Sequence, residues 1–279
     1  MSISRNGLFQ LFKYLVYFFL AMNVYWFFAQ EYLAAQLQFP HGVGPGDMIE
    51  AYAATIDTAA WVVLLLMFEL ETYVLDERHF TGPVTLTLHG LRAICYAFII
   101  YAFYGYIVNA LFLAEVSETS GITGLCTMAT GQWSYAVGLD DYIAITAANC
   151  NSFSAATSFY LFDSMQAVVD ADGLRAITIL AWVDVINAAV WLLVVLVLEL
   201  DVQLQERDRY EGLALRLSNI VKVVLYTTLL LAAIYWGVKG DFVDFWDAFL
   251  WLVAFVFIEL NVFEWRKEVI DEKLAAEQA

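Results

Sequence analysis

Three carboxylates end long apolar stretches of the sequence, where an ionisable side chain is expensive and therefore informative. Glu69, Glu199 and Glu259 each follow a run of mostly Val, Leu, Ile, Met and Phe residues. Each stretch begins with Asp or Asn and carries Trp four residues later, in the pattern [Asp/Asn]-x3-Trp-x7-Glu-Leu. The three stretches align without a gap and cover residues 57–70, 187–200 and 247–260. Such repetition predicts a repeated structural unit.

Three basic residues stand in the apolar stretches that precede these acidic ones. Lys13 and Arg92 share the pattern [Lys/Arg]-x3-Tyr-x7-Tyr, and Lys222 also has Tyr four residues later. Pairing a cation with a glutamate within each hairpin lowers the cost of burying both charges near hydrocarbon. The expected intramembrane ion pairs therefore join Lys13 to Glu69, Arg92 to Glu199 and Lys222 to Glu259. The alternatives are a ring of carboxylates that binds or relays cations, and contacts with lipid headgroups.

Further polar residues stand about twelve positions before the glutamates, nearer the other end of each stretch. Asp57, Asn187 and Asp247 occupy the aligned position, and Asp184 and Asp244 precede two of them by three residues, on the same helical face. If these helices approach a common axis, the five residues form a candidate cation pathway with an acidic mouth. The alternative is hydrogen bonding to neighbouring helices. The twelve-residue offset turns the two carboxylate sets about 120° apart, which argues against one straight pore.

The composition indicates the class of protein that must position these residues. The chain has 279 residues, of which 62% are hydrophobic and 15% charged, whereas a soluble domain has about 25% charged residues. Apolar windows long enough to cross a bilayer, roughly 20 residues each, recur along the chain. The sequence predicts an all-α integral membrane protein with six transmembrane helices, at about 8–30, 50–74, 91–115, 177–202, 215–238 and 242–265.

These helices form three pseudo-repeated hairpins within one polytopic membrane domain, 1–279. The hairpins cover residues 7–78, 90–208 and 212–268, and the middle hairpin contains a long external loop, 116–174. Within that loop, residues 153–170 have helical spacing and moderate polarity. We expect an amphipathic helix on the membrane surface there, with a re-entrant segment as the alternative.

The basic residues predict the orientation of the chain. In a six-helix arrangement eleven of them fall on one side and only Arg175 and Lys239 on the other. The positive-inside rule then places both termini in the cytoplasm, in a bacterial-type inner membrane. The formal net charge of −17 argues against nucleic acid as a partner. The expected partners are the lipid bilayer and either other membrane subunits or further copies of the chain.

The cysteines and histidines bear on redox chemistry and cofactors. Cys126 and Cys150 both lie in the external loop, where an oxidising compartment favours a disulfide between them, with two free thiols as the alternative. Cys95 is expected to be a small core residue. All three histidines fall in loops, so the spans offer no imidazole for an embedded haem or metal. We therefore expect no cofactor and no metal.

The residues leave two functional classes open. The first is a non-enzymatic membrane protein that translocates a cation or proton through pseudo-threefold acidic residues. The second is an accessory or scaffold subunit of a larger membrane complex, whose external loop docks partners. Helices that lack internal proline and have little glycine suit the second class as well as the first. An enzyme that acts on lipid at the outer carboxylates is a third, weaker alternative.

Overall fold

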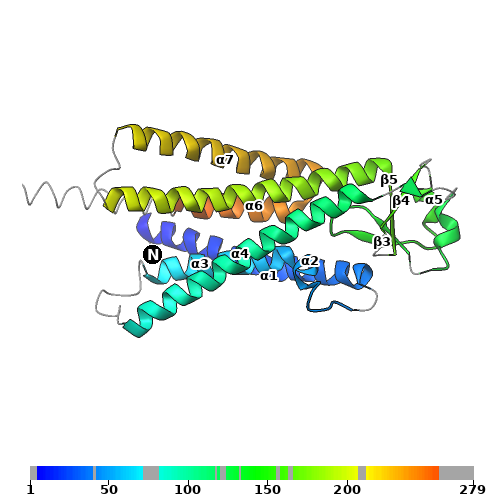
Figure 1. Cartoon of the computed structure of the whole chain (residues 1–279), viewed down its shortest axis with the longest axis horizontal. Coiled ribbons are helices and arrows are strands. Elements are labelled where there is room, and N and C mark those ends of the chain that lie inside the picture. Colours follow the sequence, from blue (N-terminus) through cyan, green and yellow to red (C-terminus); the bar gives the residue numbers. More distant parts are fainter. Residues whose placement is uncertain are drawn as a thin grey trace, which may run out of the picture. The chain divides into compact units, whose positions relative to one another are not determined.

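The chain is described by a computed structural model (Figure 1). The structure describes residues 5–39, 42–71, 82–116, 118–119, 124–131, 133–154, 158–162, 166–206 and 212–257. These residues are mostly helical, and four helices are long and apolar enough to cross a membrane. The four helices are α1 (Arg5–Gln38), α4 (Gly82–Glu115), α6 (Ala171–Glu206) and α7 (Leu213–Lys239).

Two shorter helices fall where the second and sixth spans are predicted. The 17-residue helix α3 (Ala53–Glu69) follows the single turn α2 (Met48–Ala51), and a last helix covers 242–257. The predicted sixth span continues to 265, beyond the described residues. The four long helices agree with a membrane protein, while the count of six spans and the threefold repeat remain predictions.

The chain divides into two compact units. One combines Met1–Asn23 with Val194–Ala279, and the other is Val24–Leu193. Helices α1 and α6 each contribute one part to each unit. We call them the split unit and the central unit.

In the central unit, α3 packs against α4. Ala60 of α3 meets Cys95 and Ile99 of α4 in a buried apolar cluster, so Cys95 is a core residue as predicted. Further along α4, Gly105 lies against α2, where an added Cβ would come within 3.1 Å of Ile49 Cγ1 and 3.3 Å of its carbonyl oxygen. The glycine inside this span therefore allows a close approach of two helices.

The segment between α4 and α6 contains a small sheet, so the predicted surface helix over 153–170 is wrong. The five strands are β1 (Glu118–Thr119), β2 (Ser134–Ala136), β3 (Tyr142–Ala144), β4 (Phe159–Phe162) and β5 (Ala167–Asp170). Their order is β1-β4-β5-β2-β3, with β2 and β5 parallel and the other pairs antiparallel. The aromatic and β-branched residues of β4 and β5 favour strands, which the apparent helical spacing conceals.

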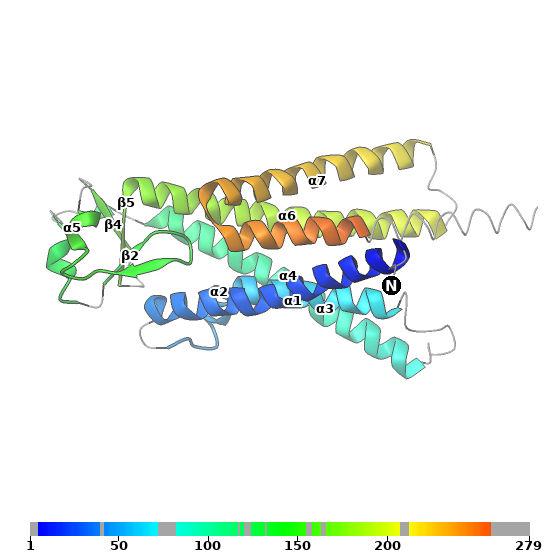
Figure 2. The same cartoon turned by 180° about the vertical axis from the view of Figure 1, so that it is seen from behind.

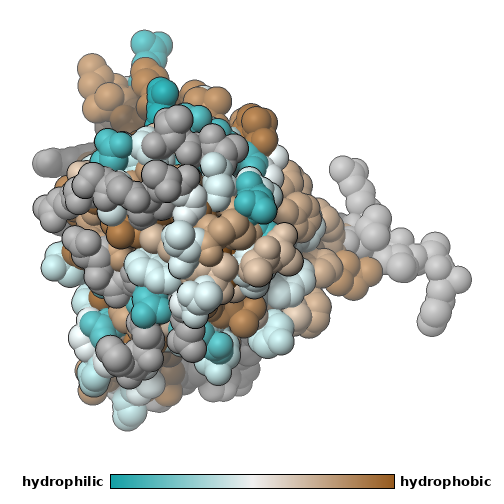
Figure 3. Space-filling model, turned by 90° about the vertical axis from the view of Figure 1, so that its right-hand side faces the viewer, coloured by the Kyte–Doolittle hydropathy of each residue, from teal (hydrophilic) through white to brown (hydrophobic). Residues whose placement is uncertain are grey.

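Two apolar clusters support the sheet. One includes residues of α4 and α6, and the other includes Cys150. Phe162, Ala167 and Val169 pack with Ala110 of α4 and Ile177 of α6. This cluster fixes the sheet on the two helices. Figures 1 and 2 show the sheet at the ends of α4 and α6. Teal and white residues are spread among brown ones on the face of Figure 3, which looks onto this end.

The second cluster contains the cysteine pair. Leu125, Phe159 and Val168 pack with Cys150 at the start of α5 (Cys150–Phe153), and the short 3₁₀ helix η3 (Leu125–Met128) carries Cys126. The two sulfurs lie 1.90 Å apart with the Cα atoms at 4.9 Å, which agrees with the predicted disulfide. The bridge closes a 24-residue separation around the β2–β3 hairpin.

In the split unit, α7 turns back into the 242–257 helix at Gly240, whose φ of 88° favours glycine. The turn brings Gly237 against the ring of Phe245. The far end of the last helix lies beside the start of α1, where Phe9 and Phe12 meet Phe257 edge to face (Figure 2). The first and last described helices are therefore neighbours.

Candidate functional site

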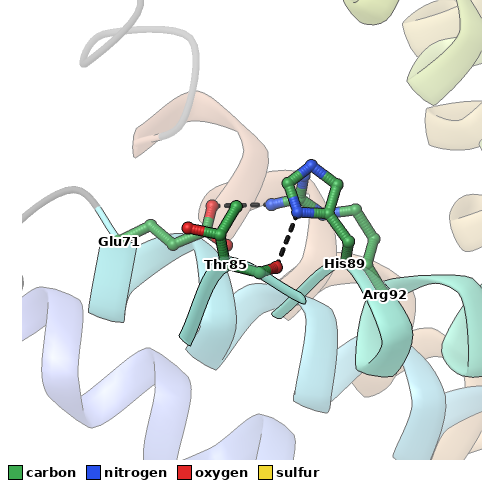
Figure 4. Close-up of polar contacts among 4 residues, drawn as sticks. All are labelled: Glu71, Thr85, His89 and Arg92. Atoms are coloured by element: carbon green, nitrogen blue, oxygen red, sulfur yellow. Dashed lines mark hydrogen bonds and ion pairs between the residues drawn. The ribbon is translucent and has the colours of Figure 1, made fainter. Parts of the chain in front are cut away.

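An ion pair joins the end of α3 to α4 in the central unit. Arg92 Nη2 lies 2.6 Å from Glu71 Oε2, and the two side chains are 34% and 24% exposed (Figure 4). Glu71 lies two residues beyond the last residue of α3, and Arg92 lies in the first third of α4. One turn earlier, His89 hydrogen-bonds the carbonyl oxygen of Thr85 in its own helix at 2.8 Å. The pair therefore ties together two helices that follow each other in the chain.

A second ion pair repeats this arrangement in the split unit. Lys222 Nζ on α7 lies 2.9 Å from Asp201 Oδ2 near the end of α6, and these side chains are only 15% and 9% exposed. The hydroxyl of Ser218 donates to the same carboxylate oxygen at 2.7 Å. Asp201 is thus satisfied by a cation and a hydroxyl from the next helix.

These partners are carboxylates other than the expected glutamates, whose own pairings remain predictions. Arg92 and Lys222 pair with Glu71 and Asp201, which stand two positions beyond the aligned Glu69 and Glu199. Two residues turn about 200° around a helix, so the paired carboxylates project from a different side than the aligned glutamates. Glu199 itself is exposed on α6, while Glu69 is buried in α3. Each observed pair also joins one predicted hairpin to the next rather than closing a single hairpin.

The remaining members of the expected pairs are Lys13 and Glu259. Lys13 is buried on α1, with its Nζ 5.2 Å and 5.9 Å from the ring centroids of Tyr14 and Tyr17. Such cation–π contacts help to accommodate a charge in an apolar setting. Glu259 lies outside the described residues.

The carboxylate of Asp247 has a different environment in the split unit. The amide nitrogen of Asn23 on α1 donates to Asp247 Oδ1 at 2.7 Å, and the indole N–H of Trp251 donates to the same carboxylate. Asn23 is 0% exposed, and its Oδ1 has no hydrogen-bond partner among the described residues. The partners described for Asp247 are therefore neutral donors, in contrast to those of Glu71 and Asp201.

The contact between Asp247 and Trp251 uses the four-residue spacing that recurs in the three aligned stretches. Residues four apart lie on the same face of a helix, so an indole can reach back to a carboxylate one turn earlier. Asp57 with Trp61 and Asn187 with Trp191 have the same spacing on α3 and α6. In the last helix this spacing serves a hydrogen bond from Trp251 to Asp247, whereas Asn187 Oδ1 on α6 has no hydrogen-bond partner among the described residues.

The candidate cation pathway is divided between the two units. Asp57, Asp184 and Asn187 lie in the central unit, and Asp244 and Asp247 lie in the split unit. All five side chains are partly buried. Asn187 Oδ1, like Asn23 Oδ1, is buried without a hydrogen-bond partner among the described residues. A common mouth formed by all five remains a prediction.

A further buried carboxylate, Glu31, does not follow from the repeat. It stands in the apolar stretch of α1 and is 6% exposed. Its two oxygens accept hydrogen bonds from the backbone N–H groups of Ala54 and Thr55 at 2.8 and 3.0 Å and from the Thr55 hydroxyl at 2.5 Å. Glu31 thus caps the N-terminus of α3, where the helix dipole favours a negative charge. The one signal in the sequence is an isolated acidic residue within an apolar span.

The sheet is joined to the helices by polar contacts as well. Gln38 on α1 donates to the Tyr142 hydroxyl of β3 at 2.9 Å, and burial raises the pKa of Tyr142. Asp170 caps α6 by accepting from the Gly173 N–H at 2.6 Å. Burial, with a further contribution from Asp170, raises the pKa of Tyr135 to about 12.

Comparisons of the chain with protein-family models, with curated proteins and with solved structures find no match.

Proposed function

We propose that this chain is a non-enzymatic multi-pass membrane protein that binds and translocates a small cation. The observation that carries the proposal is the contrast between two kinds of carboxylate. Glu71 and Asp201 are neutralised by Arg92 and Lys222, whereas Asp247 is held by the neutral donors Asn23 and Trp251. An ionisable residue inside a membrane span commonly marks the path of an ion or proton.

The ion pairs have a structural role in this proposal. A charge within a membrane span costs about 2.5–3.5 kcal/mol on insertion scales, and a partner of opposite charge reduces this cost. The two pairs therefore fasten α3 to α4 and α6 to α7 without leaving a free carboxylate. Among the described residues the Asp247 carboxylate meets neutral amide and indole donors rather than a basic side chain, so it can take up a small cation.

The proposed setting is a bacterial-type inner membrane, with both termini in the cytoplasm and the sheet outside. The eleven-to-two distribution of basic residues supports this orientation. The cysteine pair supports it independently, because disulfides persist in oxidising compartments. Asp247 then lies in the outer half of its helix, and Glu71 and Asp201 lie at the inner ends.

A second candidate function is an accessory subunit of a larger membrane complex. The observation in its favour is the sheet between α4 and α6, a disulfide-linked structure that a simple ion path does not require. An external domain of this kind is suited to docking a partner protein. Further copies of the chain or other membrane subunits are the proposed partners.

Flux measurements on the purified chain in liposomes separate the two functions. Cation translocation predicts uptake of H⁺, Na⁺ or K⁺ down an imposed gradient, faster than in protein-free liposomes. The control is the Glu199→Gln variant, which changes an exposed carboxylate and is expected to retain the flux. Liposomes that remain silent to all three cations, with a complex of fixed stoichiometry recovered from native membranes, would favour the accessory role.

A further inference from the structure

We infer that Asp247 and Asn23 form a binding site for a proton. This inference rests on the proposed cation translocation and names the cation. Among the described residues, the side-chain amide of Asn23 forms a hydrogen bond through its nitrogen and none through its oxygen. The nitrogen donates to Asp247 at 2.7 Å, while the oxygen is buried without a partner among the described residues. A buried acceptor left unsatisfied costs about 1–3 kcal/mol, so its presence beside a carboxylate calls for an explanation.

Protonation of Asp247 supplies the missing donor. When a proton moves from a hydronium ion to a carboxylate oxygen, water is released and the new carboxyl O–H requires an acceptor. A half-turn of the Asn23 amide about its last side-chain bond exchanges its nitrogen and oxygen, because the two occupy similar volumes. The oxygen then accepts from the protonated Asp247. The same amide therefore serves the charged form as a donor and the neutral form as an acceptor.

The environment of Asp247 suits a proton better than a metal ion. A hard cation such as Na⁺, Mg²⁺ or Ca²⁺ needs several oxygen ligands. The carboxylate of Asp247 already accepts hydrogen bonds from two N–H donors, Asn23 and Trp251. The Oδ1 atom of Asn23 is the one additional oxygen ligand described at the site. Within the described part of the chain, no three His, Cys, Asp or Glu side chains gather to hold a metal. The protonated, neutral carboxyl group of Asp247 needs one hydrogen-bond acceptor for its O–H, and the amide oxygen of Asn23 provides it.

Other ionisable groups of the packed helices surround this site at different depths. In its own helix the acidic neighbours are Asp244, three residues earlier, and Asp241 at the turn. The outer end of α7 carries Tyr235 and Lys239, whose Nζ lies 5.7 Å from the Tyr235 ring centroid. On α1, Lys13 stands ten residues before Asn23, about 15 Å along the helix. Asp244 and Asp241 favour an incoming proton by charge, and Lys239 opposes it.

The site is tested by infrared difference spectroscopy of the purified full chain during a pH titration, following the carbonyl stretch of protonated carboxyl groups. We expect a titrating band that disappears in Asp247→Asn, which keeps the size of the side chain. The band should shift in frequency in Asn23→Leu and in the milder Asn23→Ser, because the hydrogen bond to the carboxyl group is lost or altered. Asn219→Leu, a change at an exposed asparagine of α7, should leave the band unchanged.

Two results would overturn the inference. One is an unchanged band in well-folded Asp247→Asn. The other is removal of the wild-type band by Na⁺ at constant pH, which would show competition by a metal ion for the same carboxylate. Liposome flux separates this outcome from failure of the proposed function. Na⁺ or K⁺ flux without the band contradicts the proton site alone, whereas the expected band with silent liposomes contradicts translocation alone.

Discussion

The amide nitrogen of Asn23 lies 2.7 Å from a carboxylate oxygen of Asp247, although the two residues are 224 positions apart in the chain. Their hydrogen bond fastens α1 to the 242–257 helix, and the contacts of Phe9 and Phe12 with Phe257 extend the same interface. The first and last described helices are thus joined by both polar and aromatic contacts. This interface places a carboxylate among neutral donors.

The two ion pairs should differ in their contribution to stability. Asp201→Asn removes the ion pair of Lys222, whose side chain is only 15% exposed, so we expect a loss toward the 3–5 kcal/mol of a broken buried pair. Glu71→Gln affects a more exposed pair and should cost about 0.5–1 kcal/mol. Thermal unfolding in detergent measures both effects.

The control for this comparison is Glu199→Gln at an exposed position, with an expected effect within about 0.5 kcal/mol. Lys222→Gln added to Asp201→Asn should recover part of the loss, because the buried charge that has lost the Asp201 carboxylate is removed as well. Equal losses at Asp201 and Glu199 would contradict the pairing described for α6 and α7.

Glu31 should be important for the attachment of α3 to α1. Glu31→Leu removes the acceptor for two backbone N–H groups and the Thr55 hydroxyl, and we expect a loss of about 1–3 kcal/mol per unsatisfied buried donor, reduced where water replaces it. Glu31→Gln should cost less, since its amide oxygen still accepts. Glu50→Gln on α2 is the matched control at an exposed carboxylate. Similar melting temperatures for all three variants would show that the cap contributes little.

Reduction of the disulfide should loosen the sheet selectively. On the chain-entropy estimate, closing a loop of this length stabilises the folded state by roughly 3 kcal/mol. We expect Cys126→Ser with Cys150→Ser to increase proteolysis within 116–170 while the long helices stay protected. Peptide mapping without reductant should recover the linked pair. Recovery of two free thiols from unreduced material would contradict the bridge.

The sheet should also lose stability at high pH because of Tyr135. The pKa of Tyr135 is raised from about 10 to about 12 in the folded chain, so the fold favours the neutral phenol. Its contribution to stability is present below pH 10 and is lost as the pH rises from about 10 to about 12. Tyr135→Phe should flatten the pH dependence of unfolding in this interval, measured by near-ultraviolet circular dichroism at fixed denaturant. If unfolding of Tyr135→Phe depends on pH as steeply as unfolding of the wild type, Tyr135 does not cause the loss of stability at high pH.

Some of these features follow from the sequence and others do not. Hydropathy predicts the long apolar helices, and the position of Cys126 and Cys150 in one segment that is predicted to be external predicts their pairing. The partners of Arg92 and Lys222 do not follow from the alignment, because repetition draws attention to Glu69 and Glu199 rather than to residues two positions later. Helix rotation decides which of the two carboxylates meets the next helix.

Non-local contacts account for the remaining differences. The strands at 159–170 are fixed by pairing with β1 and β2 and by burial against α4 and α6, which local spacing does not reveal. Neither Glu31 nor Asn23 belongs to the repeated pattern, and the role of each depends on contacts with a helix that is distant in sequence. The spacing of Asp247 and Trp251 is visible in the sequence, but the donor role of the indole is seen only in the structure.

Proton flux into liposomes carrying Asp247→Asn, compared with Asp201→Asn, tests the central claim most directly. Both variants exchange a carboxylate for an amide of similar shape, one held by neutral donors and the other by Lys222. With a pH gradient as the driving force and folded protein matched by size-exclusion chromatography, we predict that Asp247→Asn abolishes flux. Asp201→Asn should lower the melting temperature and keep the flux per folded molecule. Full flux in Asp247→Asn, or its loss only in Asp201→Asn, would contradict the account.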